Sequence, residues 1–441
     1  MQDYFYTLAD FIDKQLQNNE ITLCELTAEQ SDFIRFNKGH IRQPGSVEQR
    51  YLEIDLIKDK RRATGELALS GDTRTDYERI GTLLSELREQ LSQIPDDPYL
   101  LYATDVQSTE SIGTNQLPAA EDALTEISSA TQGHDFVGIY AAGGIFTGFA
   151  NSLGQRNWHS NYSFNLDWSI YHNKDKAVKS AYAGFNWEPP TFQEKVTESL
   201  TQLTLLKRKP HTAKPGKYRV YLSPNALYEI LQLLSWNGFG LKAQRTKETA
   251  LLRMLETPAQ QLHPSITLTE NTAQGIAPAF QSEGFIKPAQ IPLISKGVYD
   301  TALISPRSAK EYSTNTNGAN DDETPQSFDL AAGDFAVADI LKTLEKGIYI
   351  NNLWYLNYSD RAACRMTGMT RFATFWVENG EIVAPLNAMR FDETLYHIFG
   401  EKLMALTAER ELIIETDTYE KRSSGSARLP GALVEDFTFT L

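Results

Sequence analysis

Apolar residues three or four positions apart mark the helices that the first half of the chain predicts. Residues 3–17 show this spacing, and residues 81–94 place leucines on one helical face before a turn with two prolines. Further helices are expected over residues 119–130 and 190–206. These segments are predicted to be amphipathic helices.

Between these helices, apolar and polar residues alternate with period two. The alternation in residues 32–45, 51–57 and 63–71 predicts a meander of antiparallel strands, with a turn at Lys58–Arg61. From Phe136 to Trp187 the pattern predicts further short strands with aromatic faces. The first half is therefore expected to be a helix-plus-antiparallel-sheet domain.

A polar segment separates the two halves of the chain. Residues 207–216 contain two prolines and a glycine and show no apolar periodicity, which is typical of a linker. Because single domains usually stop growing near 250 to 300 residues, a chain of 441 residues is expected to form two domains. We predict an α+β protein with an N-terminal domain over 1–206 and a C-terminal β-rich domain with helices over 217–441, barrel-like or a curved sheet.

The C-terminal half opens with a strand and a helix. Residues 217–222 alternate as a strand does, and Ser223 and Pro224 then suit the N-cap and first turn of a helix that should stop at Gly238. Its predicted buried stripe is Leu227, Leu231 and Leu234.

Two later segments are predicted from turn and cap residues. Residues 313–327 lack apolar side chains and are expected to form an exposed loop. Residues 333–347 are predicted to be a helix, with Asp334 as its N-terminal acid and Gly347 as its C-cap.

A strand is expected over residues 347–356, and a β-hairpin over residues 366–386. Asn379 and Gly380 at the hairpin's tip suit the two positive-φ positions of a type I′ turn. The hairpin is therefore interpreted as scaffold.

Composition and charge narrow the class of protein. With 41% hydrophobic and 22% charged residues the chain is an ordinary globular one, and no run approaches the length of a membrane span. A formal charge of −15 opposes direct DNA binding, since phosphate neutralisation requires a basic surface and the only dense basic run is 207–209. Residues 1–20 carry acids where a secretory signal has a basic region, so a cytoplasmic location is expected.

No catalytic constellation is visible in the residues themselves. The seven histidines include no pair at helical ligand spacing, although His159 and His172 share a strand-rich region and could meet in space. Cys24 and Cys364 are far apart and are interpreted as small buried hydrophobic residues. The glycine-rich stretch 138–149 lacks the phosphate-binding lysine motif and is expected to be a strand pair with close backbone approach.

Several stretches, taken in order, resemble the TldD/PmbA family, also called TldD/TldE peptidases or modulators of DNA gyrase. The resemblance covers nearly the whole chain and includes the hairpin at 366–386. Its other segments are Ile34–Gly39, Phe149–Gly154, Tyr218–Pro224, Ser282–Gly284, Ile294–Val298, Lys346–Tyr349 and Arg390–Thr394. Gln281 and Ser282 depart from the family, because an acidic pair is usual before Glu283 and Gly284.

The resemblance implies a metallopeptidase assembly with two kinds of subunit. A TldD-type subunit carries an HExxxH helix and a cysteine near the carboxyl end as metal ligands, and a TldE/PmbA-type subunit lacks them. Here the matching helix has no histidine; its residues are Tyr228, Glu229, Ile230, Leu231, Gln232, Leu233, Leu234, Ser235 and Trp236. The matching carboxyl-terminal segment has no cysteine; it contains Ser423, Ser424, Gly425 and Ser426, which are interpreted as a flexible turn.

The chain is therefore expected to be the TldE/PmbA-like, non-catalytic type, with no catalytic or metal-binding residue of its own. The resemblance implies that it pairs with a zinc-bearing TldD-like subunit, or with itself as a dimer, and helps to hold extended or unfolded peptide. Two alternatives stay open. One is an active metal-dependent peptidase with unfamiliar ligands such as His159, His172 or Glu229, and the other is a stand-alone dimeric binding or regulatory protein.

Overall fold

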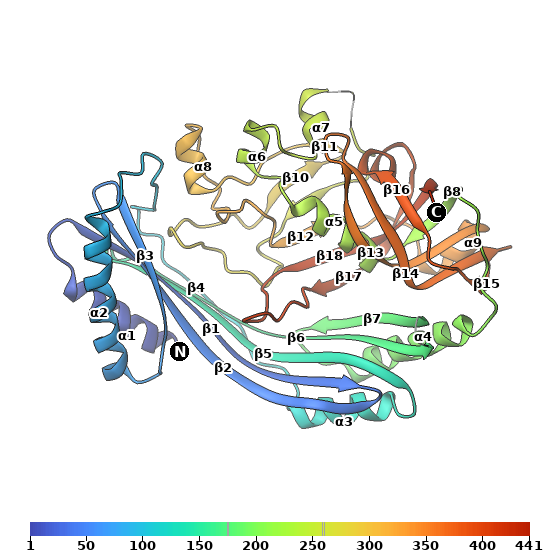
Figure 1. Cartoon of the computed structure of the whole chain (residues 1–441), viewed down its shortest axis with the longest axis horizontal. Coiled ribbons are helices and arrows are strands. Elements are labelled where there is room, and N and C mark those ends of the chain that lie inside the picture. Colours follow the sequence, from blue (N-terminus) through green and yellow to red (C-terminus); the bar gives the residue numbers. More distant parts are fainter. Residues whose placement is uncertain (174–175, 258, 260) are drawn as a thin grey trace.

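The computed structural model describes residues 1–173, 176–257, 259 and 261–441. Figure 1 shows long strands of the N-terminal half as a curved sheet running beneath the C-terminal half, with helix α3 on the opposite side of that sheet. We call the sheet face toward the C-terminal half the inner face, and the opposite face the outer face. No helix among the described residues combines the length and apolar character needed to cross a membrane.

The N-terminal sheet has the order β3-β2-β1-β5-β6-β4, with β7 beside β6. All of its pairings are antiparallel except β4 with β6. Its strands are β1 (Glu20–Asn37), β2 (His40–Lys58), β3 (Arg61–Ala68), β4 (Thr109–Ile112), β5 (Asp135–Asn151), β6 (Arg156–Asn173) and β7 (Lys176–Gly184). The expected short strands over 136–187 are instead long ones, and the stretch 138–149 lies within the single strand β5 rather than a strand pair.

Four helices pack on the outer face in two apolar clusters. The helices are α1 (Gln2–Gln15), α2 (Thr73–Leu91), α3 (Ala120–Ala130) and α4 (Pro189–Leu206). Helices α1 and α2 bury one cluster against β1, β2 and β3, whereas α3 and α4 bury a second cluster against β5, β6 and β7. All four predicted helices are confirmed, although α2 begins earlier than expected, at Thr73, where Asp72 caps it.

The C-terminal sheet is a curved, mixed sheet. Its longest path runs β11-β10-β9-β12-β18-β16-β14-β13-β8, with β15 beside β14 and β17 beside β18. Its strands are β8 (Gly216–Leu222), β9 (Leu268–Glu270), β10 (Ile291–Ser295), β11 (Val298–Tyr299), β12 (Ser327–Leu330), β13 (Lys346–Asp360), β14 (Arg365–Glu378), β15 (Glu381–Pro385), β16 (Arg390–Thr394), β17 (Leu403–Ile414) and β18 (Ser426–Phe439). The predicted α+β class is confirmed, and the sheet is curved rather than a closed barrel.

Short helices surround this sheet. They are α5 (Pro224–Ser235), α6 (Leu241–Arg245), α7 (Leu252–Glu256), α8 (Pro306–Glu311), η1 (Val337–Asp339), α9 (Ile340–Leu344) and η2 (His397–Glu401). The predicted hairpin is confirmed: β14 turns into β15 at Asn379 and Gly380, with φ of 53° and 75°.

The predicted helix over 333–347 is confirmed only in its middle, where η1 and α9 form. Its ends are wrong, because Asp334 lies before these elements and Gly347 lies inside β13 instead of capping a helix. The reason is tertiary, because a Cβ on Gly347 would lie 2.5 Å from the carbonyl oxygen of Arg219 on the neighbouring strand β8. The glycine permits this close strand approach, which the local pattern does not reveal.

The loop at 313–327 is only partly exposed. Glu323 is 3% exposed, and its carboxylate accepts hydrogen bonds from the amides of Ser305 at 2.9 Å and Lys242 at 2.8 Å. The expected exposed loop is therefore wrong in its second part, where a buried acid caps two short helices. The sequence gives no sign of these distant partners.

The predicted linker at 207–216 contains no helix or strand up to residue 215, apart from a bridge between His211 and Leu386. Phe375 of the C-terminal half nevertheless joins the cluster formed by α3 and α4. The domain boundary at this segment stays a prediction.

Candidate functional site

Helix α5 is fixed by its cap and by apolar packing. The Ser223 hydroxyl accepts a hydrogen bond from the amide of Ala226 at 3.2 Å and donates one to the carbonyl of Asn351 at 2.6 Å. Pro224 occupies the first turn, where no N–H is needed. The predicted Leu227, Leu231 and Leu234 stripe is buried, as are Ile230, Leu233 and Ser235.

The remaining side chains of α5 form one polar face. Asn225, Tyr228, Glu229 and Gln232 are only partly buried, and their spacing of three and four residues puts them on one side of the helix. The amide of Gln232 donates a hydrogen bond to the hydroxyl of Tyr228. Helix α5, which the resemblance matches to the family's metal-binding helix, thus presents Tyr228 and Glu229 toward the N-terminal half.

This polar face lines a narrow cleft between the two halves of the molecule. The cleft holds a cavity of about 80 Å³ whose walls come from β6, β7, α5 and β17. Across from α5, the Lys179 ammonium lies 3.3 Å from the Asp167 carboxylate. Burial raises the pKa of Glu229, the charge of Lys179 opposes that rise, and Asp167 adds to it.

The loop between β17 and β18, residues 415–425, reaches the same cleft; we call it the strap. The Ser423 hydroxyl donates a hydrogen bond to Oε2 of Glu415 at 2.5 Å and accepts one from the amide of Gly425 at 3.0 Å. The Tyr228 hydroxyl has its pKa raised by burial and then by the Glu415 carboxylate. The two segments that resemble the family's metal-binding segments therefore converge on Glu415.

The expected flexible turn at Ser423–Ser426 is corrected in two respects. Ser423 is tied to Glu415, and Ser426 is the first residue of β18, where it pairs with Ile414. Ser424 lies beside Ser423 in the wall of a second cavity, of about 390 Å³. The strap thus separates this cavity from the one beside α5.

Arg422 anchors the strap on the inner face of the N-terminal sheet. Its guanidinium, in a side chain that is 3% exposed, donates to the carbonyl and hydroxyl oxygens of Ser163, each at 3.0 Å, and to the carbonyl of Gly143 at 3.3 Å. Its amide donates to the Glu29 carboxylate at 3.1 Å. Burial lowers the pKa of Arg422 to about 10, against the opposing effect of Glu29.

The cavity beyond the strap holds a buried acid. Glu25 lines it, and burial, followed by the neighbouring Glu53, raises the pKa of Glu25 to about 7. Lys421 and Lys287 oppose this rise. The pKa of this inner-face carboxyl group is therefore raised toward neutrality.

Sequence patterns alone did not single out Asp167, Lys179, Glu415 or Arg422. One signal was available, because alternate residues of β6 that face inward are polar: Asn161, Ser163, Asn165 and Asp167. A strand buried on both faces normally lacks such a row, so the row indicates a polar cleft. Lys179 lies on the neighbouring strand β7, and Glu415 and Arg422 lie in the strap. The residues that they contact at the cleft are not revealed by a local pattern.

The donor groups at the cleft do not fit a zinc ion. Zinc is held by imidazole, thiolate or carboxylate, whereas Tyr228 and Ser423 offer a protonated phenol and a hydroxyl, and Leu233 offers no donor. Two of the carboxylates at the cleft are engaged, because Asp167 pairs with Lys179 and Glu415 accepts a hydrogen bond from Ser423. Across the part of the chain that the structure describes, no three His, Cys, Asp or Glu side chains gather closely enough to hold a metal ion.

The other candidate ligands lie elsewhere. His159 and His172 are both on β6, thirteen positions apart, which at about 3.3 Å per residue separates them by about 40 Å. The Nε2 atom of His159 lies 3.1 Å from the carbonyl oxygen of Ile276. The hypothesis that these two histidines meet is therefore wrong.

Both cysteines are buried, as predicted, and neither forms a disulfide. Burial raises the pKa of the Cys24 thiol above its ordinary range and that of Cys364 to about 12. Each thiol therefore stays protonated at neutral pH, which fits its interpretation as a small hydrophobic residue.

The loop that departs from the family, residues 281–284, joins the two halves. The Glu283 carboxylate accepts hydrogen bonds from the Arg62 guanidinium at 2.9 Å and from the Gln281 amide at 2.6 Å. The carbonyl of Gly284 accepts one from Gln155 at 2.7 Å. Gln281 thus contributes a neutral donor to a partly buried ion pair between the halves.

Fold and cleft together define a class of proteins in which a mostly antiparallel N-terminal sheet and a curved C-terminal sheet enclose a helix-lined cleft. Residues 215–441, more than half of the chain, match the family of the PmbA/TldA metallopeptidase C-terminal domain. The chain belongs to this family, which confirms the resemblance. No curated protein sequence matched it.

Solved structures with the same fold cover almost the whole chain. TldE from Thermococcus kodakarensis is 13% identical with a TM-score of 0.79, and the alignment covers 99% of this chain and 100% of that one. A protein described as a modulator of a DNA gyrase from Thermotoga maritima is 14% identical, with a TM-score of 0.75 and 99% of each chain covered. A similar one from Bacteroides thetaiotaomicron is 17% identical, with a TM-score of 0.73 and coverage of 99% and 98%.

Proposed function

We propose that this chain is a non-catalytic, TldE/PmbA-like subunit of a cytoplasmic metallopeptidase assembly that acts on peptides or unfolded proteins. Zinc is held by a TldD-like partner, and this chain completes the chamber around the partner's active site. Its two unpaired cysteines agree with a reducing compartment. Its charge of −15 gives no support to direct contact with DNA.

The observation that carries the proposal is the convergence at Glu415. The α5 helix and the strap meet where the family's metal-binding segments are expected to meet, but they bring Tyr228 and Ser423 in place of imidazole and thiolate. The two segments thus come near one another at Glu415, while Tyr228 and Ser423 are unsuited to holding zinc. Such a site can line a chamber without carrying out hydrolysis.

Two strand edges at the cleft could hold an extended peptide. Among the described residues, β7 pairs only with β6, and β17 pairs along its length only with β18. Lys179–Ala183 of β7 and Glu411–Ile414 of β17 both line the cavity. A free strand edge bonds the backbone of an extended chain whatever its side chains, which suits a substrate class without a fixed sequence.

Co-purification from cells, combined with metal analysis, tests the proposal. We expect the chain to recover an HExxxH-bearing protein, and peptidase activity and zinc to be present in the complex but not in this chain alone. A matched pair of variants, Glu229→Gln in the cleft and Glu248→Gln away from it, should leave the zinc content of the complex unchanged.

Stoichiometric zinc in the isolated chain, removed by a chelator together with peptidase activity and lost in Glu229→Gln, would instead show an active peptidase with unfamiliar ligands. A stable homodimer without any HExxxH-bearing partner would show a stand-alone binding or regulatory protein. Either result contradicts the proposed role.

A further inference from the structure

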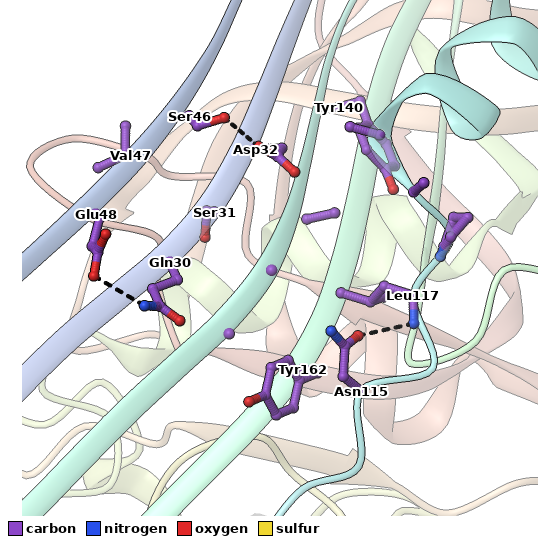
Figure 2. Close-up of a pocket in the computed structure, with 16 residues that line it drawn as sticks. Gln30, Ser31, Asp32, Ser46, Val47, Glu48, Asn115, Leu117, Tyr140 and Tyr162 are labelled. Carbon is purple, nitrogen blue, oxygen red and sulfur yellow. Dashed lines mark hydrogen bonds between the residues drawn. The ribbon is translucent and has the colours of Figure 1, made fainter. Parts of the chain in front are cut away.

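A groove of about 670 Å³ opens on the outer face of the N-terminal sheet, away from the cleft. Figure 2 shows side chains of β1, β2, β5 and β6 around an open space, with Asn115 and Leu117 of the loop between β4 and α3 along one wall. Its volume lies in the range of sites for small molecules or single side chains. Neither the family assignment nor the proposed subunit role involves this face.

The groove exists because small residues interrupt the apolar outer face. Phe146 belongs to the cluster under α1 and α2, and Phe136 belongs to the cluster under α3 and α4. Between them β5 carries Ala142 and Gly144, and a Cβ on Gly144 would come within 2.9 Å of the ring of Tyr162. Among the described helices, only the first residue of α3, Ala120, borders this gap between the two clusters.

The polar lining of the groove is rich in hydrogen-bond acceptors and carries negative charge. The Asp32 carboxylate accepts a hydrogen bond from Ser46 at 2.5 Å, and the Glu48 carboxylate accepts one from the Gln30 amide at 3.0 Å. Arg50 pairs with Glu48, whereas Asp32 has no ion pair among the described residues. No described lysine, arginine or histidine lines the groove.

A buried hydroxyl group beside Asp32 lacks a partner. Tyr140 is 0% exposed, and its hydroxyl oxygen makes no hydrogen bond to any described residue. Figure 2 shows this hydroxyl and the Asp32 carboxylate on the same side of the open space, with the ring of Tyr162 across from them. Burial and the Asp32 charge both raise the pKa of Tyr140, so it stays a neutral phenol that can donate or accept.

We propose that this groove binds an alkylammonium group, such as the end of a lysine side chain or of an aliphatic diamine. An ammonium group has three donors and no acceptor, so the Asp32 carboxylate and the Tyr140 oxygen are both suitable acceptors for it. Leu117 and Ala142 offer apolar surface to the alkyl stem. Anionic ligands are excluded by the uncompensated charge of Asp32.

Arg422 is the cation nearest to Tyr140 from the other side of the sheet. Its charge acts on the Tyr140 hydroxyl, but its guanidinium is bonded to Ser163 and Gly143 on the inner face, and the Glu29 carboxylate counters it. Arg422 therefore leaves the negative charge of Asp32 available to a ligand on the outer face.

Isothermal titration calorimetry on the full chain tests the groove. The probes are cadaverine and a lysine blocked at its backbone amine and carboxyl groups, and a norleucine blocked in the same way is the uncharged control. We expect both amines to bind and norleucine not to bind. Tighter binding of blocked lysine would identify a polypeptide side chain as the ligand, and tighter binding of cadaverine would identify a free diamine.

Two variants locate the binding. Asp32→Asn removes the charge and should weaken amine binding about tenfold or more, and Tyr140→Phe should weaken it about threefold to tenfold. Tyr140→Phe removes a hydroxyl that has no partner, so the fold should tolerate it, and thermal melting checks both variants. Asp59→Asn, in the exposed turn between β2 and β3, is the matched control and should bind like the unaltered chain.

The proposal is overturned if neither amine binds, or if norleucine binds as well as lysine. It is also overturned if Tyr140→Phe and a folded Asp32→Asn both bind the amines with unchanged affinity. Because none of these readouts involves peptidase activity or a partner subunit, failure here is separate from failure of the proposed subunit role.

Discussion

Strand β6 shows how differently the two faces of the N-terminal sheet are built. Its outward residues Phe164 and Trp168 are buried in an aromatic cluster with Phe136 and Phe192. Its inward residues are polar, and Ser163 and Asp167 face the cleft and the strap. Alternate residues of one strand thus serve a core on one side and a polar site on the other.

The contacts that hold the two faces differ in kind. The outer face is held by close apolar packing, which tolerates no loss of volume, whereas the inner face is held by a few charged or polar contacts with defined partners. Stability should therefore depend most on the outer face, and the geometry of the cleft on the inner one.

The largest expected effect comes from Trp168→Ala on the outer face. Removing a fully buried indole leaves a cavity and should lower the free energy of unfolding by about 3–5 kcal/mol. Its neighbour on the inner face gives the matched control, because Asp167→Ala should change stability by no more than about 0.5 kcal/mol. Urea unfolding followed by circular dichroism measures both, and equal losses would refute the distinction between the faces.

Arg422→Ala tests the strongest contact of the inner face. It leaves the oxygens of Ser163 and Gly143 without their guanidinium donor, which should cost about 3 kcal/mol, whereas the main-chain amide of residue 422 can still bond Glu29. Hydrogen exchange should rise across residues 415–425, because the strap loses its anchor. Lys421→Ala, at the exposed neighbouring position, should change neither quantity, and protection of the strap that survives in Arg422→Ala would contradict the anchoring role.

Glu25 should make stability depend on pH. Its pKa is raised from an ordinary 4.5 to about 7 in the folded chain, so its contribution is present at low pH and is lost as the pH rises through 7. Between pH 5 and pH 8 we expect a loss of about 2 kcal/mol that Glu25→Gln does not show. Urea unfolding at the two pH values measures the free energy of unfolding of both proteins. An equal change between pH 5 and pH 8 in both would show that Glu25 is not the group responsible.

The smallest effect is expected at Lys179. Its ion pair with Asp167 is about one-third exposed on each side, so Lys179→Met should change the free energy of unfolding by no more than about 0.5 kcal/mol. It should also raise the pKa of Glu229 further, because Lys179 is the charge that lowers it, and a carboxyl titration by NMR would detect this. A loss well above 1 kcal/mol would show that this pair holds the cleft closed.

Residues that lie close together in the sequence were enough to predict helix caps, helical faces and turns. The N-cap and leucine stripe of α5 and the Asn379-Gly380 turn were predicted at their observed positions, because caps, turns and helical faces depend on residues only a few positions apart. The ends of the segment 333–347 differ from the prediction for the opposite reason, since Phe335 bridges to the distant Thr407 and Gly347 belongs to β13, which pairs with β8.

The cleft and the groove were decided by tertiary structure. Tyr228 and Ser423 are about two hundred positions apart, and both lie near Glu415 only because β17 and β18 bring the strap back to α5. Asp32 and Tyr140 line one groove because β1 pairs with β5. The sequence determined which residues lack the donors for zinc, but the fold alone decided which side chains face each other, because contacts between distant strands depend on register rather than on local pattern.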